Sequence, residues 1–310
     1  MNISSLSENK EIEKRLAITP EITKKYIDLG FDLFLPNNYG NHLGFDDNDY
    51  KRLGVNFLDN EKDIIDKSDI IIQLGIPEDQ KLSLLKENQT LVGSLDFFSN
   101  KEKLASLKSK KINCFSLELL PRITRAQSMD ILSSQANLAG YKAVIEAFQI
   151  YERAIPMMMT AAGTIPAAKV LVVGAGVAGL QAIATAKRMG AIVFATDVRA
   201  ASKEQVESLG GKFLMVDGME NLETEGGYAK EASDDFKKKQ DDLLSQTLKK
   251  IDIVICTALI PGKEAPKIIK EDMFKNFQKG SIIYDLAAVQ GGNTVFTEVN
   301  KIVDKNGVKI

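Results

Sequence analysis

Blocks of hydrophobic and polar positions alternate along the first ~120 residues. Short apolar runs predict buried strands at residues 31–36, 70–74, 90–95 and 112–117. Polar or amphipathic segments between them predict helices at residues 20–29, 61–67, 80–86 and 101–108. Thr19 before Pro20 is typical of a helix start, with threonine as N-cap and proline in the first turn. Strands separated by helices predict βαβ units and a largely parallel sheet.

A long helix is predicted from about residue 128 to residue 154, in a segment without proline. Apolar residues recur there every three or four positions, at Leu132, Leu138, Tyr141, Val144, Ile145 and Phe148. We expect this helix to link two domains, which comprise residues 1–130 and residues 131–310.

The second half of the chain repeats the alternation. Strands are predicted at residues 169–173, 192–196, 213–216, 251–256 and 281–285, and helices at residues 179–189, 203–209, 235–249 and 267–277. Residues 217–234 are acidic, contain glycine and have no apolar period, which predicts a mobile loop. The pattern indicates an α/β fold with two Rossmann-like, doubly wound parallel sheets joined by the long helix.

The most apolar stretch, residues 154–186, is interrupted by prolines, glycines and Lys169. A membrane helix needs about 20 consecutive apolar residues, so we expect a buried core element here instead. The N-terminus has no basic region followed by an apolar core, and a secretory signal is therefore not expected.

Composition narrows the chemistry. The 310 residues contain 40 Lys and Arg against 42 Asp and Glu, a net charge of −2, which makes nucleic acid an unexpected partner. A single histidine excludes a multi-histidine metal site, and we expect no metal. Cys114 and Cys256 each lie in an apolar run, and we expect both to be buried in strands.

A GxGxxG motif carries the first chemical signal. Gly174, Ala175, Gly176, Val177, Ala178 and Gly179 follow a predicted strand and open a predicted helix. In such a turn the first glycine allows the tight bend and the second lets the backbone approach a pyrophosphate at the helix N-terminus. The third glycine permits close packing of helix on strand. We therefore expect a dinucleotide site.

Asp197 ends the next predicted strand, 23 residues after Gly174. A carboxylate at this place accepts hydrogen bonds from a ribose diol and repels a 2′-phosphate, so the position favours NAD(H) over NADP(H). Arg199 lies two residues further on and works against that preference.

A bound dinucleotide does not specify the reaction. Most dehydrogenases also move a proton and use a histidine, lysine or carboxylate for it. The single histidine, His42, lies in a predicted loop and is expected to be a solvated surface residue. Direct hydride transfer between two nicotinamides needs no acid or base, and requires polar groups that orient the carboxamide and exclude water.

Polar residues of this kind crowd one predicted strand-to-helix junction between the two domains. They are Arg122, Arg125, Gln127, Asp130 and Ser133. The same spacing fits a solvated helix N-terminus with capping residues, so spacing alone leaves both interpretations open.

Several motifs in order resemble one family, the NAD(H)-binding alpha subunits of proton-translocating NAD(P) transhydrogenases, within the alanine dehydrogenase/transhydrogenase superfamily. The resemblance extends from residues 14–21 to residues 306–310. Its motifs are residues 122–141, 174–179, 196–200, 226–230, 257–262 and 291–293.

The resemblance implies roles for individual residues. Arg122, Gln127, Asp130 and Ser133 match the loop around the nicotinamide, with Gln127 where NADP(H) of the partner approaches. Tyr228 matches the tip of a mobile loop that closes over NAD(H). The implied cofactor contacts are the glycine-loop residues with Asp197, Val198, Arg199, Tyr228, Ala258 and Leu259.

The resemblance also implies partners. The family part is a soluble homodimer that docks on an NADP(H)-binding component, and membrane-spanning subunits supply the proton channel. NADH would give its hydride to NADP⁺, driven by inward proton flow. The expected location is cytoplasmic, at the inner face of the bacterial inner membrane and attached through partners, without direct membrane insertion.

Two other functions stay open. Alanine dehydrogenase shares much of this resemblance but uses a lysine and a histidine, whose positions fall at Gln73 and Asp96. Neither is the required type, and the same mismatch counts against saccharopine-forming relatives. Gln73 also departs from the basic residue expected in transhydrogenases. The third possibility is a non-catalytic, truncated NAD-binding module.

The two ends of the chain depart from the family pattern. The opening residues 2–8 are more polar than the family's first strand, which is therefore expected to be short. Relatives continue beyond the position of Ile310 with a strand and a helix that returns to the first domain, so a missing C-terminal segment is expected.

Overall fold

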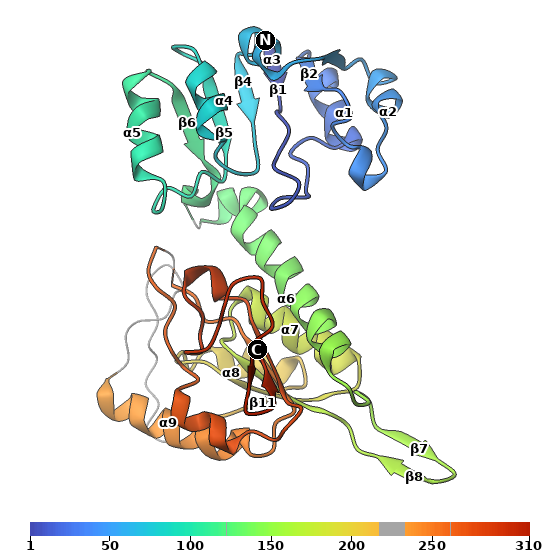
Figure 1. The fold of residues 1–310 in the computed structure, drawn as a ribbon, viewed down its shortest axis with the longest axis vertical. Coiled ribbons are helices and arrows are strands. Elements are labelled where there is room, and N and C mark those ends of the chain that lie inside the picture. Colours follow the sequence, from blue (N-terminus) through green and yellow to red (C-terminus); the bar gives the residue numbers. More distant parts are fainter. Residues whose placement is uncertain (122, 217–232, 261) are drawn as a thin grey trace. The chain divides into compact units, whose positions relative to one another are not determined.

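The computed structural model of the chain forms two compact units, unit 1 (residues 1–131) and unit 2 (residues 132–310). It describes residues 1–121, 123–216, 233–260 and 262–310, without the side chains of residues 234 and 236. Each unit contains a mainly parallel sheet with helices, which confirms the predicted α/β class (Figure 1).

Unit 1 holds a six-stranded parallel sheet in the order β3-β2-β1-β4-β5-β6. Its strands are β1 (Asn2–Ser4), β2 (Asp32–Pro36), β3 (Asn56–Leu58), β4 (Ile70–Ile72), β5 (Thr90–Gly93) and β6 (Asn113–Ser116). Its helices are α1 (Pro20–Asp28), α2 (Asp47–Lys51), α3 (Glu61–Lys67), α4 (Asp79–Leu84) and α5 (Lys101–Ser109), with 3₁₀ turns η1 (Asn41–Leu43), η2 (Leu117–Leu119) and η3 (Thr124–Met129). The hydrophobic pattern misses β3 and α2, because elements this short develop no period.

Alternate residues along the strands of unit 1 face two layers of helices. Ile71 and Leu91 belong to an apolar cluster with residues of α3, α4 and α5. Leu33 and Leu35 belong to a second cluster, with residues of α1 and α2. The sheet is therefore covered on both faces, as a doubly wound fold requires.

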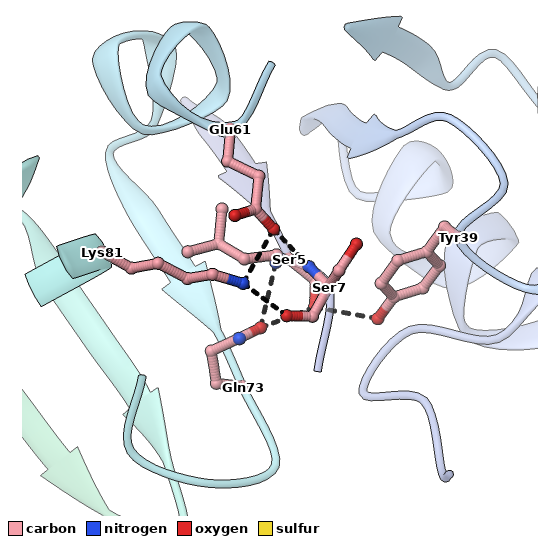
Figure 2. Close-up of polar contacts among 7 residues, drawn as sticks. Ser5, Ser7, Tyr39, Glu61, Gln73 and Lys81 are labelled. Atoms are coloured by element: carbon pink, nitrogen blue, oxygen red, sulfur yellow. Dashed lines mark hydrogen bonds and ion pairs between the residues drawn. The ribbon is translucent and has the colours of Figure 1, made fainter. Parts of the chain in front are cut away.

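A buried polar network joins the carboxyl ends of β1 and β4. Gln73 Oε1 accepts hydrogen bonds from Ser5 Oγ at 2.9 Å and from the Leu6 N–H at 3.0 Å. The Tyr39 hydroxyl donates to Ser5 Oγ at 2.8 Å (Figure 2). These strands flank the point where the strand order reverses, the place where doubly wound sheets bind ligands. In unit 1 the polar side chains at this point bond to one another.

A second set of contacts fixes the same segment after β1. Lys81 Nζ lies 2.9 Å from Glu61 Oε1 and donates to the Ser7 carbonyl at 2.7 Å (Figure 2). The Ser7 N–H in turn donates to Glu61 Oε1 at 2.9 Å. Helices α3 and α4 thus hold the chain that leaves β1.

Unit 2 holds a seven-stranded sheet in the order β11-β10-β9-β12-β13-β15-β14, parallel except for the antiparallel pair β14 and β15. Its strands are β9 (Lys169–Val173), β10 (Ile192–Thr196), β11 (Lys212–Phe213), β12 (Ile253–Cys256), β13 (Ile282–Asp285), β14 (Asp304–Lys305) and β15 (Val308–Lys309). Its helices are α6 (Ile131–Ile150), α7 (Val177–Arg188), α8 (Ser202–Ser208) and α9 (Asp234–Leu248), with 3₁₀ turns η4 (Glu271–Asn276) and η5 (Ala288–Gln290).

The strands of unit 2 are apolar on both faces. Val170 and Val172 of β9 pack in a cluster with residues of α6, α7 and α8. Leu171 and Val173 pack on the opposite face, in a cluster with residues of α9 and η4. The unbroken apolar run of β9 thus reflects a strand buried on both sides.

The long helix α6 is shorter than predicted. Residues 124–129 form the 3₁₀ turn η3, and Asp130 at its end has ψ 89°, so the α-helix starts only at Ile131. Val144 and Phe148 are buried as predicted, whereas three residues of the same apolar stripe are exposed: Leu132, Leu138 and Tyr141.

The prediction of a buried core element at residues 154–186 is wrong for the first part of this stretch. Its first part forms a two-stranded antiparallel hairpin, β7 (Met158–Thr160) and β8 (Gly163–Ile165), which projects from the rest of unit 2 (Figure 1). All six strand residues are exposed, and Met159 is 82% exposed. Burial begins further along, where Ala168 leads into β9.

Three other predictions need correction. Cys114 is exposed because β6 is an edge strand, whereas Cys256 in β12 is buried. The predicted helix at residues 267–277 shrinks to the 3₁₀ turn η4, since the N–H groups of Ile268 and Ile269 both bond the Asn293 carbonyl. Strand β11 has two residues, and most of the predicted loop at 217–234 lies outside the described residues.

The helices in the described part of the chain include none that is both long and apolar enough to cross a bilayer. Within that same part, no group of histidine, cysteine or carboxylate side chains is arranged to hold a metal ion.

Gln73→Met tests the network in unit 1. The variant keeps the side-chain size but removes the acceptor for Ser5 and leaves the buried Leu6 N–H unpaired, which should cost about 2–3 kcal/mol of unfolding free energy. Faster amide hydrogen exchange of unit 1 and a lower urea midpoint would register it. The control is Gln80→Met on the exposed face of α4, expected to change stability by less than about 0.5 kcal/mol. Equal midpoints for the two variants would contradict a stabilising role for Gln73.

Candidate functional site

The glycine loop joins β9 to α7 at the carboxyl edge of the sheet in unit 2. Gly174 has φ +93°, a conformation that L side chains rarely adopt, and its N–H donates to the Thr196 carbonyl at 2.9 Å. Helix α7 starts at Val177, two residues before the predicted start, with Gly176 as an N-cap that makes no side-chain hydrogen bond. The first turn of α7 therefore has no side-chain cap, as an anion site requires.

The other two glycines meet different demands. A Cβ on Gly179 would lie 1.9 Å from the Gly174 carbonyl oxygen, so helix and turn pack backbone against backbone. A Cβ on Gly176 would meet nothing within 4 Å, and this residue is exposed. Gly179 is thus required by packing, whereas Gly176 keeps an open face that a pyrophosphate can approach.

Helix α6 also packs closely on this turn. A Cβ on Gly140 would lie 2.1 Å from the Ala178 carbonyl oxygen, inside the first turn of α7. The sequence does not predict a role for Gly140, because a single glycine within a helical segment does not reveal which element packs against it. Its position fixes how closely α6 approaches the loop.

Asp197 follows β10 and is hydrogen-bonded to the glycine loop. Its Oδ2 accepts the Ala175 N–H at 2.7 Å, and its Oδ1 accepts the Arg199 N–H at 2.8 Å. The Arg199 guanidinium forms a two-armed pair with the same carboxylate, with Nε–Oδ1 and Nη2–Oδ2 both at 2.9 Å. Val198 lies between them and is half-buried. The structure thus brings the glycine loop, Asp197 and Arg199 together.

The segment after β12 forms the other side of this edge. The Thr257 hydroxyl lies 2.9 Å from the Gly174 carbonyl and 3.1 Å from the Val173 carbonyl, both possible acceptors. Ala258 is half-buried beside it, and Leu259 is 39% exposed. Because the strand order reverses between β9 and β12, the two predicted residues lie at the switch point of the sheet.

A buried asparagine holds that segment in place. Asn293 is fully buried, and its Oδ1 accepts the Ala258 N–H at 3.0 Å. Its Nδ2 donates to the carbonyls of Ala258 at 2.8 Å and Pro266 at 2.9 Å. The Asp285 carboxylate then accepts the Asn293 N–H at 2.7 Å. Residue-type patterns do not reveal this support, although Asn293 belongs to one of the motifs noted in the sequence.

The residues that the sequence predicts around the nicotinamide belong to two different units. Gln127 is exposed on η3, and Asp130 is half-buried at the end of that turn, both in unit 1. Ser133 is half-buried in the first turn of α6, in unit 2. Arg122 and Tyr228 lie outside the described residues. The roles of these five residues stay predictions.

Two family models match almost the whole chain. The one described as "Alanine dehydrogenase/PNT, N-terminal domain" covers residues 5–139, and "Alanine dehydrogenase/PNT, C-terminal domain" covers residues 143–310. The chain belongs to the alanine dehydrogenase/transhydrogenase family. The family resemblance expected from the motifs is thereby confirmed.

Within the family, the chain is more similar to transhydrogenases than to alanine dehydrogenases. It is 48% identical to a Rhodospirillum rubrum protein named as the first portion of NAD(P) transhydrogenase subunit alpha, over 100% of this chain and 83% of that protein. The crystal structure of a transhydrogenase from Sinorhizobium meliloti aligns with a TM-score of 0.88 at 41% identity, covering 100% of this chain and 85% of that one. An alanine dehydrogenase of Methanococcus maripaludis is 27% identical, over 99% of this chain and 79% of that protein.

In this chain, the residues at the positions of the alanine dehydrogenase lysine and histidine make structural contacts. Gln73 is 3% exposed and bonded to Ser5 and Leu6. Asp96 occupies a turn at φ +47°, where its carbonyl accepts the N–H groups of Ser99 and Asn100. His42 is exposed, with Nε2 2.7 Å from the Lys14 carbonyl. All three residues lie in unit 1, whereas the glycine loop belongs to unit 2.

Two alanine substitutions test whether Gly179 is required for packing, whereas Gly176 only leaves space for a ligand. Gly179→Ala places a methyl group against a backbone oxygen and should lower the unfolding free energy of unit 2 by about 3 kcal/mol. Gly176→Ala enters open space at φ −76° and should lower it by about 1 kcal/mol at most, the difference between glycine and alanine at an N-cap. Urea unfolding of the two variants measures the difference. A stable Gly179→Ala protein would refute the close packing.

Proposed function

We propose that this chain is the NAD(H)-binding part of a proton-translocating NAD(P) transhydrogenase. In this role it passes a hydride from NADH to NADP⁺ held on a partner subunit, and membrane-spanning subunits couple the transfer to proton translocation. The observation that carries the proposal is the match over the whole chain to relatives named as transhydrogenase alpha subunits, 48% and 45% identical.

The glycine loop supports the nucleotide part of this proposal. Backbone N–H groups from Gly176 into the first turn of α7 would hold the pyrophosphate, because α7 has no side-chain cap. Asp197 and Arg199 would face the adenosine ribose, while Ala258 and Leu259 would line the opposite side of the switch point. The cofactor would be NAD(H), with NADP(H) as co-substrate on the partner.

The reaction proposed is a direct exchange between two nicotinamides. Carbon 4 of NADH gives up hydrogen with its electron pair to carbon 4 of NADP⁺, which leaves NAD⁺ and NADPH and moves no proton at the reacting carbons. Arg122, Gln127, Asp130 and Ser133 would orient the carboxamide and exclude water. A chain with one histidine, exposed and bonded to a backbone carbonyl, suits such a reaction.

Amino-acid oxidation is less well supported. It needs a group that takes up a proton, and the lysine and histidine positions of alanine dehydrogenase are occupied here by Gln73 and Asp96. The Gln73 side chain is an amide whose oxygen already accepts two hydrogen bonds. An amide does not act as a general base near neutral pH.

The proposal includes the assembly. We infer a homodimer that docks on an NADP(H)-binding component, with both attached at the cytoplasmic face of the inner membrane through membrane-spanning subunits. The relatives' designation as subunit alpha supports partner subunits.

Reconstitution with an NADP(H)-binding transhydrogenase component tests the function. The mixture should transfer hydride from NADH to an NADP⁺ analogue whose reduced form absorbs at its own wavelength. Gln127→Ala should slow this transfer about 10- to 100-fold through lost orientation, with little change in NADH affinity. Gln80→Ala, an exposed glutamine elsewhere in unit 1, is the matched control and should leave the rate unchanged.

Other outcomes have clear meanings. NADH oxidation that depends on pyruvate and ammonia, without any partner, would establish an amino-acid dehydrogenase instead. NADH binding without transfer in the mixture, and without any effect of Gln127→Ala, would leave a non-catalytic NAD-binding module.

A further inference from the structure

The ammonium group of Lys267 lies among backbone carbonyls of one turn in unit 2, the turn of residues 290–294. Lys267 Nζ donates to the carbonyls of Gly291, of Gly292 at 3.1 Å and of Thr294 at 3.4 Å. A lysine ammonium has three N–H donors, so the three carbonyls match its capacity. Gly292 and Thr294 are buried, and a buried carbonyl needs a hydrogen-bond partner. Lys267 therefore supplies this turn with both donors and a positive charge.

Two successive glycines explain why these carbonyls gather. Gly291 has φ +94° and Gly292 has φ +82°, both in the left-handed region. A Cβ on Gly292 would in addition lie 2.5 Å from the Thr297 Cβ, so the turn has no room for a side chain there. Carbonyl dipoles that converge on one point repel each other, and a cation at that point stabilises them, as K⁺ does among the carbonyls of a channel filter.

The segment that carries Lys267 is bonded to the same turn. The Ala265 N–H donates to the Gln290 carbonyl at 2.8 Å, and the Ile268 N–H donates to the Asn293 carbonyl at 2.9 Å. These backbone bonds lie on either side of Lys267 in the sequence. The lysine side chain therefore reaches back to a turn that its own backbone neighbours already contact.

Asn293, within this turn, connects it to the switch point of the sheet. Its Oδ1 accepts the Ala258 N–H at 3.0 Å, and its Nδ2 donates to the Ala258 carbonyl at 2.8 Å. Ala258 in turn lies against the glycine loop, since a Cβ on Gly174 would be 3.2 Å from the Ala258 nitrogen. A shift of the turn would thus move the segment that faces the glycine loop.

We propose that Lys267 is a positioning residue of the nucleotide site. Its ammonium is a tethered cation that holds the turn of residues 290–294 closed and, through Asn293, keeps Ala258 in place against the glycine loop. The inference rests on the proposed function, in which Ala258 lines the nucleotide site. Truncation of the lysine would leave a cluster of carbonyls that a free alkylammonium ion can occupy.

NADH titrations of the isolated full chain, followed by nucleotide fluorescence, test the inference. Lys267→Ala should weaken NADH binding about tenfold, the effect of one charge-assisted contact. Methylammonium chloride should restore most of the lost affinity, because the ion brings a charge and three N–H donors to the vacated space. Tetramethylammonium chloride at the same concentration has the charge without the donors and should restore nothing. Lys275→Ala, at an exposed lysine of η4, is the control for loss of one positive charge and should bind NADH like wild type.

Amide hydrogen exchange at Ala258 reports the same contacts without nucleotide. The Ala258 N–H is bonded to Asn293, so it should exchange faster in Lys267→Ala than in wild type and slow again with methylammonium. The amide of Leu171, in the buried strand β9, is the reference for a general loss of stability and should exchange at the wild-type rate. The comparison separates the positioning of Ala258 from overall unfolding.

Lys267→Gln decides the question if Lys267→Ala does not fold. It removes the charge but keeps much of the side-chain length, and it should also weaken NADH binding and speed exchange at Ala258. Wild-type affinity and exchange in the folded variant, a loss equal to that of Lys275→Ala, or no advantage of methylammonium over tetramethylammonium would overturn the inference. A folded wild-type chain that fails to bind NADH would instead overturn the proposed function, while exchange at Ala258 would still test the role of Lys267.

Discussion

The site in unit 2 depends on one contact between backbones, that of Gly179 with the carbonyl of Gly174. A Cβ at position 179 would lie only 1.9 Å from that oxygen, so no side chain larger than hydrogen fits without moving the turn. The hydroxyl of Thr257, at the end of β12, lies 2.9 Å from the same carbonyl. Helix α6 contributes Gly140, which approaches the neighbouring turn of α7 as closely. The end of β12 and helices α6 and α7 thus meet at the tight turn around Gly174. The geometry of this turn leaves one face of Gly176 open and places the Ala175 N–H where it can donate to Asp197.

Much of this could be predicted from sequence, because it depends on local pattern. Strands β9 and β10 and helix α3 have the predicted bounds, since apolar runs between glycines and polar segments identify them. The GxGxxG motif identified the turn for the same reason. The support by Asn293 was not predictable, because it joins residues 35 positions apart that follow different strands. Hairpin β7–β8 was missed since its methionines resemble core residues in composition although they are exposed. The roles of Gln127, Asp130 and Ser133 remain predictions, because spacing alone fits a capped helix start equally well.

The two sheets share the order of their first five strands but differ at the point where that order reverses. In unit 1, Ser5, Gln73 and Tyr39 satisfy one another's hydrogen bonds, and the chain after β1 runs on without a glycine turn. In unit 2, Gly174 follows the corresponding strand β9, and the next helix, α7, has no side-chain cap. A buried polar group that is already paired gains little from a ligand, whereas an uncapped helix N-terminus gains a partner for its free N–H groups. The switch point of unit 2 therefore favours a bound anion, whereas the switch point of unit 1 is filled by polar side chains that bond to one another.

This difference bears on the reaction as well as on binding. Chemistry that moves a proton needs a titratable side chain whose acceptor is available, and the Gln73 amide is neither titratable nor free at its oxygen. Hydride exchange between two nicotinamides makes no such demand, since each ring needs only to be held at the right distance and angle. A fold can lose its acid and base and still support this exchange, provided that the nucleotide site keeps its geometry. Under the proposed function, the Gln73 amide in unit 1 offers no base for amino-acid oxidation, and the glycine loop in unit 2 would hold the nucleotide whose hydride is exchanged.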